Sequence, residues 1–190
     1  MAIYVTKVWG FGEPSPPLQF SLAGSRDTAR AKLNEGDLVL LVGTLDEPTD
    51  PSEQGLMLGI MEPTNTPVMC LDFDLGHHST DYNEEGNYRW PYGLLNKRAW
   101  LFDQPLTPFK TITSRNSFGS SAAQGIVKLT DVEAKKVINL ARKEISLMMP
   151  VRARARIDGH EKARRHGAPP PTTTRRGSMG NTPIIRGLDK

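Results

Sequence analysis

The chain has 190 residues, of which 37% are hydrophobic, so it is long enough and apolar enough to bury the core of one domain. No apolar run reaches the roughly 18 residues that a membrane span needs, and the N-terminal sequence lacks the basic start of a signal peptide, so we expect a cytoplasmic protein without a membrane partner. Residues 1–150 carry 14 Lys and Arg against 18 Asp and Glu, net −4, whereas residues 151–190 carry 10 against 3, net +7.

The first segment, residues 2–10, is rich in β-branched and aromatic residues and predicts a strand. Two glycines and three prolines follow within residues 10–17, which favours an extended loop. Residues 24–37 then predict a helix of about ten residues, with Ser25 as its N-cap and with a helix end at the Asn34 to Gly36 turn.

The next segments are short and apolar. Residues 38–42 form a nearly continuous apolar run, which predicts a strand buried on both faces. Residues 55–63 and 67–73 predict two further strands, separated by a turn in the sequence PTNTP. The single cysteine, Cys70, has no internal disulfide partner and is expected to be a small buried hydrophobic residue.

Residues 74–87 are polar and irregular and predict a long surface loop. Strands are expected at residues 98–102 and 109–112, because aromatic and apolar residues return there and Pro91, Pro105 and Pro108 break the segment into short pieces. Alternation in the first of these places Trp100 and Phe102 on one face, toward the core.

Residues 129–149 contain the clearest helical pattern of the chain. Thr130 and Glu133 have the spacing of a capping box, and the apolar residues that follow repeat with helical spacing on one face, which predicts packing against the sheet. Residues 151–190 are rich in Pro, Thr, Gly and Arg without periodicity, so we expect a disordered basic tail or linker, with a short helix within residues 152–166 as an alternative.

This order of elements predicts an α+β fold, a small curved β-barrel of about 5–7 short strands with two flanking helices in residues 1–150 and the flexible tail after it. The short strands and proline-rich turns favour a barrel over a parallel α/β sheet. The basic tail on an acidic body indicates attraction to a polyanion.

Signatures of common catalytic and cofactor sites are absent. The sequence has no GxxxxGK[ST], GxSxG or HExxH motif and no pair of cysteines for zinc, so we expect no metal, no cofactor and no catalytic residue of these types. His77 and His78 are adjacent, and we interpret them as part of a solvated loop rather than as metal ligands.

Aromatic residues stand beside glycine or proline at several positions of the body. These are Trp9, Phe11, Trp90 and Tyr92. Such neighbours mark strand ends and loops, where proteins hold a flipped or unpaired base by stacking. The alternative is that these rings close the ends of the barrel.

The strand that ends in an aromatic residue, the short helix, and GDLVLLVGT followed by GLMLGIMEP together resemble the PUA-like superfamily, especially its EVE-like branch, which is related to ASCH, YTH and SRA-type domains. The resemblance covers about residues 1–147. It implies a small curved barrel that binds nucleic acid, modified DNA or RNA, and that takes a modified base into an aromatic-lined pocket. In prokaryotic defence systems such readers act with a nuclease or another effector subunit.

The resemblance also implies site residues. The loop with Trp9, Gly10, Phe11 and Gly12 would border the pocket, and Trp90 and Tyr92 would form the opposing wall. A polar segment would contact base edges or phosphate; its residues are Ser114, Arg115, Asn116 and Ser117.

Two alternatives remain open at the level of sequence. One is an ASCH-like hydrolase acting on a nucleoside-like substrate, which would use Lys7, Asp37 or Glu62 as acid or base within a Lys–Glu or Thr–Lys–Glu cluster. The other is a non-catalytic protein-interaction module whose tail recruits an acidic chain.

Overall fold

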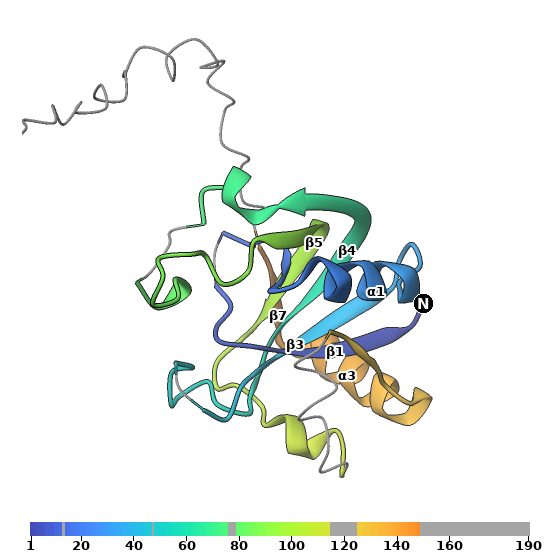
Figure 1. Cartoon of the computed structure of the whole chain (residues 1–190). Coiled ribbons are helices and arrows are strands. Elements are labelled where there is room, and N and C mark those ends of the chain that lie inside the picture. The colour runs from blue at the N-terminus through green and yellow to red at the C-terminus, as the bar shows by residue number, and fades with distance from the viewer. Residues whose placement is uncertain (13, 47, 76–78, 115–124, 149–190) are drawn as a thin grey trace, which may run out of the picture. The chain divides into compact units, whose positions relative to one another are not determined.

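The computed structural model describes every residue of the chain except 13, 47, 76–78, 115–124 and 149–190, and all described residues belong to the first of the two units into which the chain divides, Met1–Arg154. This unit is an α+β fold in which the described residues form one mixed sheet of seven strands and two α-helices (Figure 1). No helix in the described part of the chain is long and apolar enough to cross a membrane.

The sheet contains one parallel pair among its described strands, β1 (Ile3–Val8) and β3 (Leu38–Gly43), in register from Ile3↔Leu38 to Val8↔Gly43. Alternate residues of β3 enter two different hydrophobic clusters, so that Leu40 faces one and Leu41 faces the other. The prediction that this apolar run is buried on both faces is therefore confirmed.

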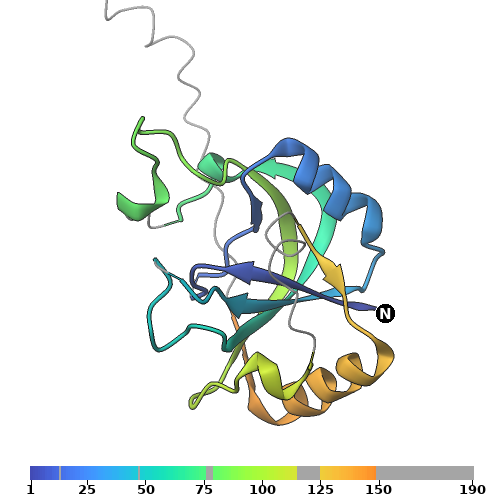
Figure 2. The same ribbon diagram turned by 60° about the horizontal axis from the view of Figure 1, so that its bottom comes forward.

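Two helices cover the two faces of the sheet. The helix α3 (Asp131–Glu144) packs with Val137 and Ala141 in the first cluster, and α1 (Ala23–Lys32) contributes Ala29 to the second. Figure 2 shows α1 and α3 on opposite sides of the strands. The predicted capping box is confirmed, since Glu133 N donates to Thr130 Oγ1 (3.3 Å) and Thr130 N donates to Glu133 Oε2 (2.8 Å).

The remaining strands extend the sheet on both sides of this parallel pair. Their order is β2-β5-β4-β3-β1-β6, and β7 pairs with the same β5 that pairs with β2. The bounds are β2 Leu18–Phe20, β4 Met57–Met69, β5 Tyr92–Phe102, β6 Val127–Lys128 and β7 Ile145–Leu147. Among the described residues the end strands β2 and β6 do not pair with each other, so the hydrogen bonds leave the predicted barrel open.

The predicted turn in PTNTP is wrong, because β4 continues through it as one strand of 13 residues. The register against β5 shifts on both sides of Pro63 and is restored at Pro67. A proline lacks the N–H that a ladder needs, and a bulge accommodates it without ending the strand. This long, bent strand pairs with β5 along nearly its whole length.

Other predicted boundaries also differ. The segment expected as a strand at residues 109–112 is the 3₁₀ helix η3 (Phe109–Thr111), although Phe109 is buried as expected of a core residue. The N-cap of α1 is Leu22, so Ser25 lies inside the helix. The final helix ends at Glu144, because the next three residues pair with β5 as β7 instead of continuing it.

Short 3₁₀ helices lie within the region between β4 and β5. The first, η1 (Cys70–Asp72), begins at Cys70, which is fully buried as predicted. The second, η2 (Ser79–Asp81), lies in the polar segment that was expected to be a loop.

Candidate functional site

An open pocket of about 830 Å³ lies at the end of the parallel pair β1 and β3. Because β1 and β3 are parallel, the loops that follow them leave the same edge of the sheet, and Thr44 N donates to Val8 O (2.9 Å) where they separate. Open sheets often bind ligands at the carboxyl ends of parallel strands. The pocket is lined by residues of segments 7–19, 44–53 and 75–90, with Leu41 and Met61 from the sheet.

Trp9 and Trp90 meet edge to face at this pocket, with ring centroids 4.5 Å apart and an interplanar angle of 86°. The aromatic contact continues from Trp90 to Tyr88 (6.0 Å, 86°). Arg89 places its guanidinium 5.6 Å from the centre of the Trp9 ring and donates from Nε to the carbonyl of Thr80 (3.1 Å). These contacts join the segment before β5 to the end of β1, residues that are about 80 positions apart in sequence.

Phe11 turns inward. An added Cβ on Gly59 of β4 would lie 2.2 Å from Phe11 Cε1, so the phenyl ring covers this glycine, and Phe11 packs against the second hydrophobic cluster. The half-buried Trp9 and the inward Phe11 both line the pocket, together with the exposed Gly12. Phe11 therefore forms part of the floor of the pocket, and Trp9 forms part of its wall.

Tyr92 is not among the residues that line the pocket. It begins β5, pairs with Phe20 and Met69, and holds its ring 5.6 Å from the guanidinium of Arg26. Trp90 does not form an opposing wall either, because it contacts Trp9 directly, and Tyr88 lines the pocket next to Trp90. The predicted contact residues Arg115, Asn116 and Ser117 lie outside the described residues.

Tyr88 was not selected from the sequence, although its spacing of two residues from Trp90 in the sequence YRW is the signal that points to it. It is buried, and its hydroxyl donates to Gln19 Oε1 (3.1 Å). Burial, together with the nearby Cys70 and Asp81, raises the pKa of Tyr88, so the phenol stays protonated at neutral pH.

The charged side chains of the pocket are mainly acidic. Lys7 is accompanied by Asp50, Glu53 and Asp81. Burial and the neighbouring Asp50 raise the pKa of the half-buried Glu53. None of these acids was selected from the sequence, because the loop in which Asp50 and Glu53 lie carries no motif.

The three residues considered for a hydrolase do not share a site. Lys7 lines the pocket, but Asp37 lies at the opposite end of the β1–β3 pair, where it accepts hydrogen bonds from Ala2 N (2.5 Å) and Asn34 N (3.0 Å). Burial opposes ionisation of Asp37, but these hydrogen bonds outweigh it and lower the pKa. Asp37 is therefore a structural carboxylate.

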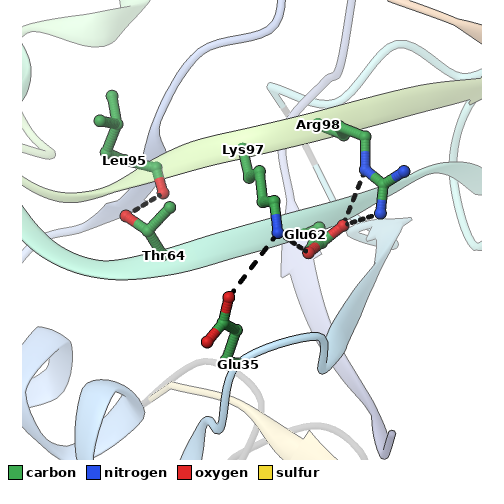
Figure 3. Close-up of polar contacts among 6 residues, drawn as sticks. All are labelled: Glu35, Glu62, Thr64, Leu95, Lys97 and Arg98. Carbon is green, nitrogen blue, oxygen red and sulfur yellow. Dashed lines mark hydrogen bonds and ion pairs between the residues drawn. The ribbon is translucent and has the colours of Figure 1, made fainter.

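Glu62 forms a charged cluster on β4 and β5 (Figure 3). It is 3% exposed and accepts from Arg98 Nε (2.9 Å) and Nη2 (2.5 Å), while Lys97 Nζ lies 3.3 Å away and 3.8 Å from Glu35. Burial opposes its ionisation, but the contacts with Arg98 and Lys97 prevail and lower the pKa of Glu62.

A carboxylate that two cations hold ionised is a poor proton acceptor at neutral pH. Thr64, on the same strand, donates its hydroxyl to the carbonyl of Leu95 (3.0 Å) rather than to either member of the Lys97–Glu62 pair. The cluster thus connects β4 to β5 and to the loop after α1, and none of its members lines the pocket.

His77 and His78 lie outside the described residues. Within the part of the chain that the structure describes, no group of three or more His, Cys, Asp or Glu side chains has the geometry to hold a metal ion.

No family model matches the chain. No curated protein matches it. The crystal structure of protein PSPTO5229 from Pseudomonas syringae is similar with a TM-score of 0.39 and 14% sequence identity, and the alignment covers 73% of this chain and 99% of that one.

Proposed function

We propose that residues 1–150 form a nucleic-acid-binding module of the PUA-like, EVE-like type, in which the curved sheet holds a modified or flipped base in the pocket at Trp9. The observation that carries the proposal is the pair Trp9 and Trp90, which stand at right angles and line one pocket together with Phe11. The volume of about 830 Å³ lies within the range of small-molecule sites, so it accommodates a base with its sugar.

Stacking supplies the affinity for the base. A base that stacks on an indole gains about 1–3 kcal/mol, and every base has a π-face, so this term is independent of sequence. In an edge-to-face pair, the ring that offers its edge keeps its own faces clear of the other ring. Because Arg89 lies over the Trp9 ring, a flat ligand would stack on the face of Trp9 that Arg89 leaves uncovered.

The basic residues that would attract the phosphates of a nucleic acid belong to residues 151–190 and not to the pocket. The pocket has more acidic than basic side chains, and residues 1–150 have a net charge of −4, so the phosphates of a bound strand stay away from the pocket floor. Residues 151–190, net +7, add affinity that falls as salt rises. A nuclease or another effector subunit, in the cytoplasm of a prokaryote, is the partner that would use such a reader.

The test is a titration of the full chain with single-stranded oligonucleotides that differ only in one central base, methylated or unmodified, at two salt concentrations, followed by fluorescence anisotropy. We expect tighter binding to one modified base, and we expect Trp9→Ala to weaken binding to every oligonucleotide and to remove that preference, because without the stacking surface the base is no longer held in the pocket.

Trp100→Phe is the matched control, because Trp100 packs against the first cluster away from the pocket and its replacement keeps an aromatic ring. It should leave the preference unchanged. Equal affinity for every oligonucleotide, with no effect of Trp9→Ala, would contradict base reading.

A further inference from the structure

Glu53 places a carboxylate beside the aromatic wall of the pocket. A Cβ added to Gly10 would lie 3.5 Å from Glu53 Oε2, so the carboxylate faces the backbone between Trp9 and Phe11. The side chain is half-buried and lines the same pocket as both rings. A ligand stacked at Trp9 thus has an acceptor group at its edge.

This carboxylate has no hydrogen bond or ion pair with any described residue, in contrast to its neighbour Asp50. Asp50 Oδ1 accepts from Ser52 N (2.8 Å) and Ser52 Oγ (2.6 Å). Burial and the neighbouring Asp50 raise the pKa of Glu53. A ligand donor would give the half-buried carboxylate the hydrogen-bond partner that the described residues do not supply.

The backbone holds Glu53 in place. Glu53 N donates to Asp50 O (2.8 Å), and Leu56 N donates to Glu53 O (3.1 Å). The same carbonyl packs so closely on Gly43 that a Cβ there would lie 2.1 Å from it. The base of the side chain is therefore preorganised, which is the condition for a group that selects between ligands of similar shape.

We propose that Glu53 is the specificity-determining residue of the pocket, accepting an N–H from the exocyclic amino group of the base that stacks at Trp9. The pocket then takes amino-bearing bases, such as those of the cytosine and adenine type, in preference to their keto or unsubstituted counterparts. This inference rests on the proposed function and names the class of base.

The chemistry of base edges supports this choice. Cytosine presents its N4 amino group and adenine its N6 amino group as donors, whereas thymine presents the O4 acceptor at the corresponding position. A keto oxygen facing the Glu53 carboxylate would pair two acceptors. Sites built to bind an N–H reject an analogue without it strongly, because the buried protein group is left unpaired.

The test uses the full chain and short single-stranded oligonucleotides in two matched pairs at one central position, cytosine against uracil and adenine against unsubstituted purine. We expect the amino-bearing member of each pair to bind about tenfold more tightly or better, the effect of one hydrogen bond to a charged group. In Glu53→Gln the ratio should fall toward one, because an amide both donates and accepts.

Asp46→Asn is the matched control, since it removes one negative charge from the same loop at an exposed residue that does not line the pocket, and it should keep the ratio. Equal binding of both members of each pair by the wild-type protein, with binding still lost in Trp9→Ala, overturns this inference and leaves the proposed function standing. Absence of binding to every oligonucleotide overturns both. An unchanged ratio in a folded Glu53→Gln protein overturns the role of Glu53.

Discussion

Phe11 lies against Gly59, so closely that an added Cβ on Gly59 would be 2.2 Å from Phe11 Cε1 and 2.5 Å from the carbonyl oxygen of Trp100. This contact fixes the floor of the pocket, because it anchors the loop after β1 to β4. The loop therefore depends on the absence of a side chain at one position of a neighbouring strand.

Gly59→Ala should accordingly destabilise the protein by about 1–3 kcal/mol in urea unfolding, the usual cost of an added group in a packed core. Phe11 can rotate away, but the Trp100 carbonyl belongs to a paired strand and cannot. Gly24→Ala is the control, since Gly24 lies in α1 with open space around its Cα, and alanine there should be neutral or stabilising. Equal stability of wild-type protein and Gly59→Ala would contradict the packing described.

The contact of Trp9 with Trp90 should appear as an interaction energy. A double-mutant cycle of Trp9→Leu and Trp90→Leu, followed by chemical unfolding, should give about 0.5–1.5 kcal/mol, as measured for other edge-to-face pairs. The expectation follows from the centroid distance of 4.5 Å. Additive single effects would show that the two rings do not interact in solution.

Glu62 should make stability depend on pH. Its folded pKa is lowered below the unfolded value, so its contribution is present above the unfolded pKa, near 4.3. That contribution is lost as the pH falls through the folded value. Urea unfolding at pH 7 and at about pH 3 should therefore show a larger loss for wild type than for Glu62→Gln.

At pH 7, Glu62→Gln should cost about 1–3 kcal/mol, because buried hydrogen bonds to charged groups are weakened. Glu35→Gln is the control, since the Glu35 side chain is 93% exposed and its contact with Lys97 is 3.8 Å long, so it should change stability by less than about 1 kcal/mol. If Glu62→Gln lost as much stability at about pH 3 as wild type does, the loss would be due to other carboxylates.

Cys70 should be unreactive in the folded protein. Its side chain is fully buried, and burial together with Asp72 raises the pKa of the thiol to about 12, so the thiolate that reacts with alkylating agents is scarce at pH 8. Mass spectrometry after iodoacetamide treatment should show no modification in buffer and complete modification in urea. Rapid labelling of folded protein would contradict this burial.

Much of the fold was predictable because its signals are local. Each of these signals lies within a few residues of sequence: the apolar runs of β1 and β3, and the capping box of Thr130 and Glu133. The structure contains all three. The strands β2, β6 and β7 have only two or three residues each, too few to show periodicity, so only pairing with longer strands defines them.

The sequence by itself determined that aromatic residues gather beside glycine and proline at strand ends, and it identified Trp9, Phe11 and Trp90. Only the tertiary structure decided that Phe11 packs onto Gly59 and that the Glu53 carboxylate faces Gly10, between Trp9 and Phe11. The physical reason is that strand pairing, β1 with β3 and β4 with β5, brings together residues that are far apart in sequence. The conformational preferences of neighbouring residues do not determine which distant strands pair.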